Sequence, residues 1–310
     1  MRIGLDMMGG DFAPLEALRG CELARKSMEG ITLVMFGDKG VLAEIAEEEG
    51  IDLSNFELIH CPEVIGMGEH PTKALAQKKE SSIAVGFHLL KEQKIDAFIG
   101  AGNTGAMMVG SMFSVKQVEG VFRPAITSVL PKISGNIGIL LDVGANADCR
   151  PDVLYQFAVL GSQFCKYVYK IDNPRVGLLN IGEEREKGNL VTQAAHNLMA
   201  ETNDFNFIGN VEGRDLFLDN VDVVVSDGFT GNIVLKACES MYYLLMKRGV
   251  KDEFLDRFNY ESYGGTPILG VNAPVIIGHG ISKAVSFESM IRLAKETVES
   301  GLIDKIKSSF

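Results

Sequence analysis

Three glycine-rich stretches combine residue types that can bind an anion. They are Met8-Gly9-Gly10-Asp11, Gly102-Asn103-Thr104-Gly105 and Gly228-Phe229-Thr230-Gly231. Each follows a short apolar run and precedes a helical pattern, and glycine lets backbone N–H groups approach an anion closely at a helix start. We therefore expect these turns to form a pocket for a phosphate-bearing substrate.

Two of these turns repeat one pattern. The segment 96–105 aligns without gaps with the segment 222–231, and each contains a strand-like run, a Gly-x-Thr-Gly turn and a helical pattern. Local helix capping alone would explain the shared glycines and threonines. Because α/β sites lie beyond the carboxyl ends of strands, we favour the interpretation that both turns face one ligand from the same sheet edge.

A dense charge cluster at 182–189 follows another apolar run and opens a helix. Its acidic residues suit the positive end of the helix dipole, as in an ordinary solvated first turn. A lysine at that position is unfavourable unless something negative binds there. We therefore expect Lys187 to contact a phosphate or an acyl carrier.

Polar residues also follow two other apolar runs and surround the turn at 228–231. Asp142 is expected to orient a substrate rather than to carry a proton, although a capped helix entry would explain the same residues. The stretch 226–232 places a carboxylate, two hydroxyls and a carboxamide around one turn. His279 lies in a glycine bend and is kept as a binding candidate, although a structural histidine is the more common outcome there.

Several other chemistries lack their residues. The stretch 100–105 matches G-x-G-x-x-G, but the next strand ends in Pro131-Lys132 and offers no acidic residue for a ribose. No P-loop, G-x-S-x-G or H-E-x-x-H motif occurs. The five cysteines are scattered and show no metal-ligand spacing. We expect neither a nucleotide cofactor nor a metal.

Composition and length indicate a folded enzyme rather than a polyanion binder. The chain has 310 residues, 46% of them hydrophobic, and a net charge of −11, which disfavours nucleic acid as a partner. The first residues pass directly into strand-like sequence without an export signal, so we expect a cytoplasmic location. The uncharged stretch 97–115 is too rich in glycine and polar residues to predict a membrane span.

Apolar runs alternate with helical patterns along the chain. This alternation predicts a doubly wound α/β fold of three layers, α/β/α, with a mainly parallel mixed sheet. Residues 1–310 are expected to form one catalytic domain, or two lobes around a cleft. The connection between the strands 125–130 and 137–141 is too short for a crossover helix, which predicts an antiparallel hairpin. Further strands are expected at 2–5, 32–36, 56–60, 97–99, 176–180, 205–208 and 221–225, and helices at 14–28, 40–49, 72–91, 104–115, 151–169, 189–200, 232–248 and 282–300.

Together these motifs resemble those of the bacterial phosphate acyltransferase family, PlsX. The resemblance runs in the family's motif order from Met1 to about Phe310, and six motifs in sequence are far more specific than any one of them. The sequence departs mildly from the family's pattern at Met7, Gly100 and Ile281, and none of these departures affects Lys187. The six motifs that carry the resemblance are 4–11, 101–106, 142–146, 187–189, 226–232, and 270–272 together with 278–280.

This resemblance implies transfer of a fatty acyl group from acyl-acyl carrier protein to inorganic phosphate. The product would be an acyl phosphate for phospholipid synthesis, consumed by a membrane-embedded glycerol-3-phosphate acyltransferase, PlsY. The resemblance also implies a homodimer, peripheral association with the inner face of the membrane, and a fold similar to phosphate acetyltransferases and isocitrate-type dehydrogenases. No metal or organic cofactor is implied.

Phosphate is itself a competent oxygen nucleophile, so such an enzyme needs to position it against the thioester and stabilise the oxyanion. We expect Lys187 and Asn232 to neutralise the phosphate or the oxyanion, with Asp227 and Asn103 orienting them. The other expected binding residues are Gly9, Gly10, Gly102, Thr104, Gly105, Asp142, Asn146, Asn189, Gly228, Thr230, Gly231 and His279.

A run of apolar residues lies within the helical segment 232–260, which we expect to contact either the membrane or the second subunit of a dimer. A helix that is apolar all round must be buried in protein or lipid, and the basic pair Lys247-Arg248 would favour an anionic membrane surface. The run is much too short to span a bilayer. Its expected contact residues are Met241, Tyr242, Leu244, Leu245 and Met246.

Two alternatives stay open at this point. A short-chain phosphate acetyltransferase that uses coenzyme A would share the chemistry but would need a site for the adenine and its phosphates. A non-catalytic scaffold that recruits acyl carrier protein to the membrane would need neither Lys187 nor the two Thr-Gly turns. Thioester loss from each kind of substrate, with and without phosphate, would separate the three.

Overall fold

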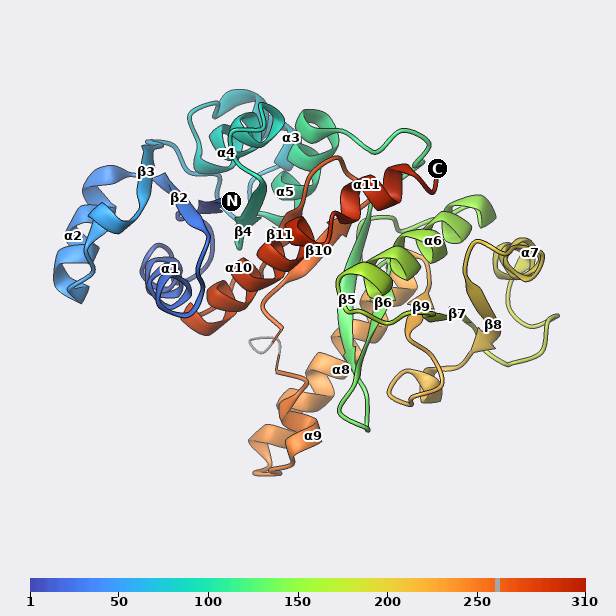
Figure 1. The fold of residues 1–310 in the computed structure, drawn as a ribbon. Coiled ribbons are helices and arrows are strands. Elements are labelled where there is room, and N and C mark those ends of the chain that lie inside the picture. Colours follow the sequence, from blue (N-terminus) through green and yellow to red (C-terminus); the bar gives the residue numbers. More distant parts are fainter. Residues whose placement is uncertain (260–262) are drawn as a thin grey trace. The chain divides into compact units, whose positions relative to one another are not determined.

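The computed structural model describes residues 1–259 and 263–310, and the chain divides into two compact units. Unit 1 consists of Met1–Gln117 and Tyr260–Glu299, and unit 2 consists of Val118–Asn259 and Ser300–Phe310. The chain therefore leaves unit 1 after its first 117 residues, returns to it after Asn259, and ends in unit 2 (Figure 1).

The sheet of unit 1 is parallel except for its last strand. In spatial order its strands are β3 (Glu57–His60), β2 (Thr32–Gly37), β1 (Arg2–Asp6), β4 (Ala97–Gly100), β11 (Val275–Ile277) and β10 (Thr266–Leu269). Only β10 runs antiparallel to its neighbour, β11. Its helices are α1 (Leu15–Ser27), α2 (Lys39–Glu49), α3 (Pro71–Gln77), α4 (Ser82–Lys91), α5 (Thr104–Gly110), followed by a π-helical turn at Ser111–Val115, and α10 (Ala284–Glu299).

Helices cover the strands of unit 1 closely. Helices α1 and α10 pack against each other, and α4 contacts β1, β2 and β4 (Figure 1). The ring of Phe98 on β4 meets Phe36 and Phe87 edge-on, at centroid distances of 5.8 and 5.1 Å. A Cβ on Gly86 of α4 would lie 2.2 Å from the Phe98 ring, so glycine is needed there for the helix to approach the sheet. Burial of each such ring stabilises the fold by about 1.5–3 kcal/mol.

The sheet of unit 2 begins with the predicted hairpin. In spatial order its strands are β5 (Ala125–Pro131), β6 (Ile137–Leu141), β9 (Val223–Val225), β7 (Arg175–Leu179) and β8 (Asn206–Val211). The β5–β6 pair is antiparallel and the remaining pairs are parallel. The helices are α6 (Pro151–Tyr167), α7 (Leu190–Ala200), α8 (Gly228–Lys247), α9 (Glu253–Asp256) and α11 (Leu302–Lys307).

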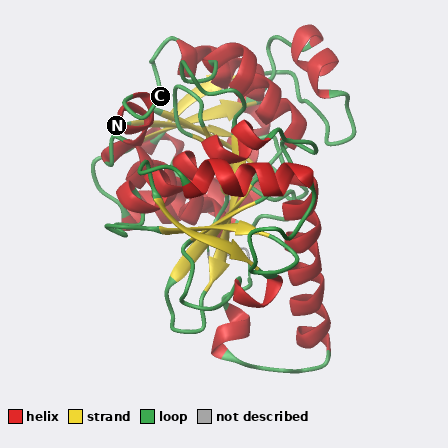
Figure 2. Ribbon diagram, turned by 90° about the vertical axis from the view of Figure 1, so that its right-hand side faces the viewer, coloured by secondary structure: helices red, strands yellow, loops and turns green. Residues whose placement is uncertain are grey.

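Helix α6 is the central helix of unit 2. It contacts β6, β7 and β9, and α7 and α11 pack against it. Helix α8, in contrast, buries only Gly228 and Gly231 in its first turn, and the rest of its length contributes no buried residue. Figure 1 shows α8 and α9 beside the β5–β6 hairpin, and Figure 2 shows strands enclosed between helices. None of the helices in the described ranges is long and apolar enough to cross a membrane.

The predicted α/β class, its mainly parallel sheet and the hairpin are confirmed. The single helix predicted at 72–91 is wrong, because the chain forms α3 and α4, and the Ser81 hydroxyl accepts a hydrogen bond from Ala84 N to start the second helix. The start predicted at Asn232 is also wrong, because α8 begins four residues earlier, at Gly228, with Asp227 as its N-cap. Strand β10 and the short helices α9 and α11 were not predicted. The segment 232–260 contains α8 without its first turn, and α9, and its last residue lies outside the described ranges.

Candidate functional site

Every residue expected in the binding or catalytic site follows the carboxyl end of a strand. In unit 1 these are the neighbouring parallel strands β1, β4 and β11, and in unit 2 they are the neighbouring parallel strands β6, β9 and β7. The unit 1 cluster contains Gly9, Gly10, Gly102, Asn103, Thr104, Gly105 and His279, and the unit 2 cluster contains Asp142, Asn146, Lys187, Asn189, Asp227, Gly228, Thr230, Gly231 and Asn232.

Close backbone packing shapes the unit 1 cluster. A Cβ on Gly9 would lie 2.6 Å from Gly102 N, so the loop after β1 and the turn after β4 touch only because both residues are glycine. Gly10 has a φ of 110°, and Asp11 N donates to Gly280 O (2.7 Å). The loops after β1, β4 and β11 are therefore in contact with one another.

The side chain of Asn103 is fully engaged inside unit 1. Its Oδ1 accepts a hydrogen bond from Ala106 N (2.9 Å) and caps α5. Its Nδ2 faces three carbonyl oxygens, those of Gly66 (3.0 Å), Met67 (3.2 Å) and Glu69 (2.9 Å). Asn103 can therefore position the turn after β4, whereas its amide is already committed to protein partners.

A buried carboxyl group supports the loop after β1. Asp6 is 1% exposed, and its Oδ1 accepts a hydrogen bond from Met8 N (3.1 Å). Its buried Oδ2 makes no hydrogen bond of normal geometry with any residue that the structure describes. Burial raises the pKa of Asp6, because an ionised carboxylate is costly away from water.

Asp142 organises the unit 2 cluster through hydrogen bonds. Its Oδ1 accepts from Ile126 N (2.9 Å) and Ala145 N (3.2 Å), and its Oδ2 accepts from Asn146 N (2.6 Å) and Asn146 Nδ2 (2.9 Å). Asn146 O in turn accepts from Gly228 N (2.7 Å). Asp142 thus connects the loop after β6 to the start of α8. Burial raises the pKa of its carboxyl group.

The turn after β9 leaves no room for side chains at its two glycines. A Cβ on Gly231 would lie 2.0 Å from Asp142 O, and one on Gly228 would lie 2.6 Å from Asp142 Oδ2. Asp227 caps α8 by accepting from Thr230 N (2.7 Å) and Thr230 Oγ1 (3.0 Å). The N-terminus of this 20-residue helix is therefore tightly fixed against the β6 loop, with its positive dipole end at the strand edge.

Asn232 and Lys187 extend from the turns on either side of this edge. A Cβ on Gly144 would lie 3.7 Å from Asn232 Oδ1, which places the Asn232 amide beside the β6 loop. The Lys187 side chain is 46% exposed, and its Nζ lies 4.0 Å from Glu184 Oε2, too far for a strong ion pair. Unit 2 thus offers an amide and an ammonium group on the turns after neighbouring strands β9 and β7.

The loop that carries Lys187 contains supports that the sequence did not reveal. A Cβ on Gly182 would lie 2.9 Å from Lys187 Cγ, so this glycine makes room for the aliphatic stem of the lysine. Gly188 has a φ of 90°, and a Cβ there would lie 2.2 Å from Thr192 Oγ1. Asn189 caps α7 by accepting from Thr192 N (2.9 Å). In the sequence, the only indication of these supports was the pair Gly182 and Gly188 on either side of the charged run.

The cysteine side chains are poorly suited to act as thiolate nucleophiles. Burial raises the pKa of Cys149, which follows the Asn146 loop, to about 12, and that of Cys61 to about 12. The pKa values of Cys21, Cys165 and Cys238 are raised for the same reason. Within the described ranges, no group of three or more His, Cys, Asp or Glu side chains is placed to hold a metal ion.

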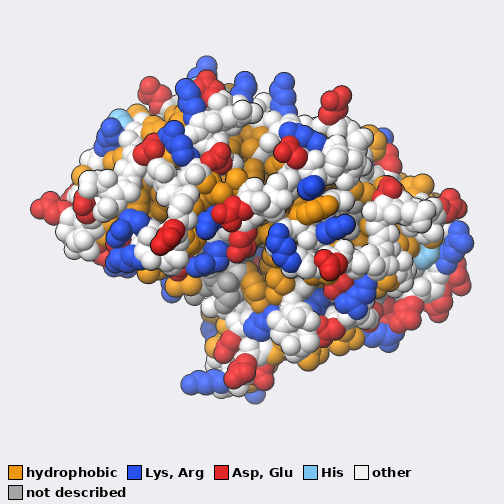
Figure 3. All heavy atoms as spheres, in the orientation of Figure 1, with side chains coloured by type: hydrophobic (Ala, Val, Ile, Leu, Met, Phe, Trp, Pro, Cys, Tyr) orange, Lys and Arg blue, Asp and Glu red, His pale blue; other side chains and the backbone are white. Residues whose placement is uncertain are grey.

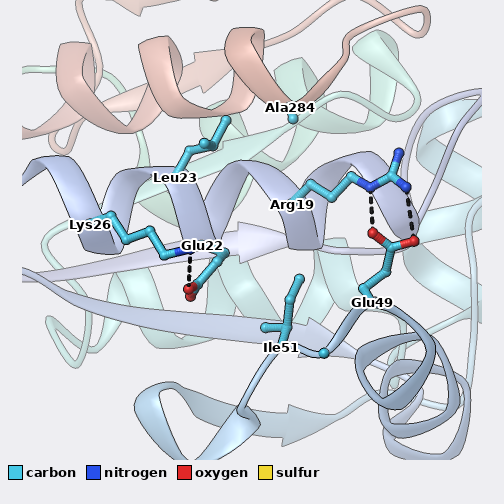
Figure 4. A pocket seen from close by; sticks show the side chains of 8 residues that line it. Arg19, Glu22, Leu23, Lys26, Glu49, Ile51 and Ala284 are labelled. Carbon is cyan, nitrogen blue, oxygen red and sulfur yellow. Dashed lines mark hydrogen bonds and ion pairs between the residues drawn. The ribbon is translucent and has the colours of Figure 1, made fainter.

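Unit 1 also contains a pocket of about 320 Å³ lined by residues of α1 and its neighbours (Figure 4). Its charged groups pair with each other, as Arg19 Nε lies 2.7 Å from Glu49 Oε2 and Lys26 Nζ lies 3.0 Å from Glu22 Oε1. Basic and acidic side chains are also interspersed over the face of the molecule that Figure 3 shows. We therefore place the candidate site at the strand ends and not in this pocket.

Comparison with known proteins identifies the family. The family model described as "Fatty acid synthesis protein" matches residues 1–305. A phosphate acyltransferase from Desulforamulus reducens is 43% identical over 328 residues, covering 100% of this chain and 97% of the relative. One from Pelotomaculum thermopropionicum is 43% identical over 329 residues, covering 100% and 95%. The chain belongs to the phosphate acyltransferase (PlsX) family. The predicted family resemblance is thereby confirmed.

Solved structures share the fold of this family member. The EutD phosphotransacetylase from Staphylococcus aureus has a TM-score of 0.66 at 18% identity, covering 96% of this chain and 94% of that one. A phosphotransacetylase from Streptococcus pyogenes has a TM-score of 0.68 at 15% identity, with coverages of 96% and 94%. Likenesses at such low identity show the fold alone, and they confirm the predicted fold class.

Proposed function

We propose that this protein transfers a fatty acyl group from acyl-acyl carrier protein to inorganic phosphate and releases an acyl phosphate for phospholipid synthesis. The full-length identity to phosphate acyltransferases supports the reaction class. The observation in the structure that carries the proposal is the unit 2 cluster, where Lys187 and Asn232 follow neighbouring strands beside the N-terminus of α8. A cation, an amide donor and a positive helix end suit phosphate and a developing oxyanion.

In this proposal the protein positions the reactants and forms no covalent intermediate. A phosphate oxygen attacks the thioester carbon, the carbonyl oxygen gains negative charge in the tetrahedral intermediate, and the thiolate of the carrier leaves as the carbonyl re-forms. Lys187 and Asn232 would offset this charge, with Asp227 holding the turn that carries Asn232. The raised pKa values of the cysteines support direct transfer, since a protonated thiol is a weak nucleophile. The backbone of the unit 1 cluster remains a second candidate anion contact.

Exposed apolar side chains next to the unit 2 cluster suit the acyl chain or the arm that carries it. Ile181 is 81% exposed and Leu190 84% exposed, and these two residues flank the Lys187 loop. Phe229, in the turn after β9, is 65% exposed. We infer that these side chains contact the substrate, since an acyl chain is stabilised by burial against apolar side chains. Their positions favour a long acyl substrate over acetyl-coenzyme A.

One assay tests the reaction and its substrate. Purified protein is mixed with palmitoyl-acyl carrier protein or with acetyl-coenzyme A, with and without phosphate, and thioester loss is followed. We expect phosphate-dependent loss from the carrier-linked substrate and formation of an acyl phosphate. Preferential use of acetyl-coenzyme A would instead support the short-chain alternative, and no phosphate-dependent loss from either substrate would support a scaffold.

We also propose that α8 contacts the inner face of the membrane or the second subunit of a homodimer. Its outer half exposes Met241, Tyr243, Leu244 and Met246. Lys247 lies 4.5 Å from the Tyr243 ring centroid, and Arg248 follows directly. An apolar helix face next to basic residues suits an anionic membrane surface. Such a location would place the product close to a membrane-embedded glycerol-3-phosphate acyltransferase.

Flotation with anionic liposomes distinguishes membrane contact by α8 from contact with the second subunit. The wild type is compared with the double variant Leu244→Glu/Leu245→Glu, and the mass of each protein in solution is measured. Lost flotation with an unchanged, active dimer supports membrane contact. A variant that becomes monomeric supports the dimer contact, and a variant that still floats as a dimer contradicts both.

A further inference from the structure

The turn that carries Lys187 is closed at one carbonyl group. Glu184 O accepts a hydrogen bond from Lys187 N (3.1 Å). The same oxygen accepts a second hydrogen bond, from Asn210 Nδ2 (2.8 Å), which comes from the neighbouring strand β8. A carbonyl oxygen has two lone pairs and can accept both. Asn210 therefore binds the turn at the atom that fixes the backbone of Lys187.

A buried histidine sets the orientation of the Asn210 amide. Asn210 is 6% exposed and His196, on α7, is 8% exposed. His196 Nδ1 lies 3.1 Å from Asn210 Oδ1, and the His196 ring packs edge-on against Phe207. Because Asn210 donates through Nδ2 to Glu184, its Oδ1 is the acceptor, and Nδ1 of His196 carries the hydrogen. A flipped amide would bring its oxygen against Glu184 O and lose that hydrogen bond.

Further side chains hold the rest of the turn through its backbone. Gln193 Nε2 donates to Glu186 O (2.7 Å), and Asn180 Nδ2 donates to Lys187 O (3.2 Å). The side chain of Lys187, by contrast, is half exposed, and its Nζ lies 4.0 Å from Glu184 Oε2. The backbone under the lysine is thus held tightly from β7, β8 and α7, while its ammonium group remains available. This is the arrangement expected of a functional residue set on a preorganised support.

We propose that Asn210, oriented by His196, is a positioning residue for Lys187. It does not reach the substrate, and it acts by holding the Glu184–Lys187 turn so that the ammonium group meets the reacting oxygen atoms. Loss of this support would let the turn adopt several conformations, of which few would place Lys187 correctly. The inference rests on the proposed role of Lys187 in acyl transfer.

A double-mutant cycle with Lys187 tests the proposal. We expect Asn210→Ala alone to lower kcat by about 10-fold, since a displacement of about 1 Å in a catalytic group has effects of this order or larger. In a Lys187→Ala background, Asn210→Ala should change kcat by less than about twofold, because two residues that act as a unit are not additive. An undiminished effect in that background would overturn the proposal.

Two further variants provide the matched controls. His196→Phe keeps an aromatic ring beside Phe207 but removes the donor to Asn210, and it should reproduce most of the loss of kcat. Asn220→Ala removes another side-chain amide of unit 2, which donates to Asp215 (3.1 Å) and not to the Lys187 turn, and it should leave kcat unchanged. Equal effects of Asn210→Ala and Asn220→Ala would contradict a specific role.

Hydrogen exchange separates this inference from the proposed function. In Asn210→Ala, and in His196→Phe if the first variant does not fold, amide exchange in peptides covering 181–189 should rise while that in β7 stays unchanged. Unchanged exchange in 181–189 would overturn the positioning role whatever the kinetics show. Wild-type turnover of Lys187→Ala, together with raised exchange in Asn210→Ala, would retain Asn210 as the support of the turn and reject the catalytic role of the lysine.

Discussion

The two units place an aspartate at the same point of the same arrangement and use it differently. Asp6 ends β1 beside β4, and Asp142 follows β6 beside β9; in each case the neighbouring strand leads into a Gly-x-Thr-Gly turn. Asp142 accepts four hydrogen bonds and fixes its loop through them. Asp6 accepts one from Met8 N, and its Oδ2 stays unpaired among the described residues.

This difference shows two ways to join a strand-end loop to a helix start. In unit 2 a chain of hydrogen bonds runs from Asp142 through Asn146 to Gly228, at the start of α8. In unit 1 the contact is steric, because Gly9 and Gly102 touch directly and Asp6 fills the space behind them. We therefore expect unit 2 to depend on the chemistry of its aspartate, and unit 1 to depend mainly on its glycines.

The two clusters also differ in charge, because the unit 2 cluster contains Lys187 and the unit 1 cluster, as defined above, contains no lysine or arginine. This difference leads to the largest expected effect. Lys187→Ala should lower kcat by about 10²-fold or more, the scale of removing one oxyanion-stabilising donor, while the thermal midpoint barely moves. His279→Ala, the matched change at a charged or polar residue of the unit 1 cluster, should have a smaller effect. Turnover of both variants is measured with palmitoyl-acyl carrier protein and phosphate. Wild-type turnover of Lys187→Ala would remove the catalytic assignment, and a larger loss in His279→Ala would move the chemistry towards unit 1.

The second expected effect concerns stability in unit 2. Asp142→Asn would place an NH₂ group where Oδ2 now accepts from Asn146 N and Asn146 Nδ2. Two facing donors leave buried groups unpaired, so we expect a loss of about 2 kcal/mol in the free energy of unfolding. Urea denaturation measures this loss, with Asp152→Asn, a half-buried aspartate on α6 that pairs with Arg150, as the control. A cost no larger than that of the control would show that Asp142 does not organise the loop.

Much of this arrangement could be predicted from the sequence because it depends on local patterns. Apolar runs identified most of the strands, and the charge of Lys187 at a helix start indicated its loop. Helix starts were harder to predict, since Ser81 and Asp227 act as caps only in the folded geometry. Asn210 and His196 gave no signal, because the partners of Asn210, Glu184 and His196, are both distant from it in sequence. Such buried pairs become visible only in three dimensions.

The smallest effect, and the most direct test of the comparison, concerns Asp6. Asp6→Asn replaces a carboxyl group that has one hydrogen bond by a neutral group of the same shape, so we expect a stability within about 1 kcal/mol of the wild type near pH 4–5.

Burial raises the pKa of Asp6 in the folded state, so the folded protein binds the proton more tightly than the unfolded chain does. Wild-type stability should therefore fall as the pH rises from the unfolded pKa of about 4 towards the raised folded value, by about 1.4 kcal/mol per pH unit from this group alone. The variant lacks this titration, so its stability relative to the wild type should increase in urea denaturation as the pH rises above the unfolded pKa of about 4. A difference that stays constant as the pH rises above about 4 would contradict a raised pKa of Asp6. A loss in Asp6→Asn as large as that in Asp142→Asn would show that the two aspartates stabilise their loops to the same extent.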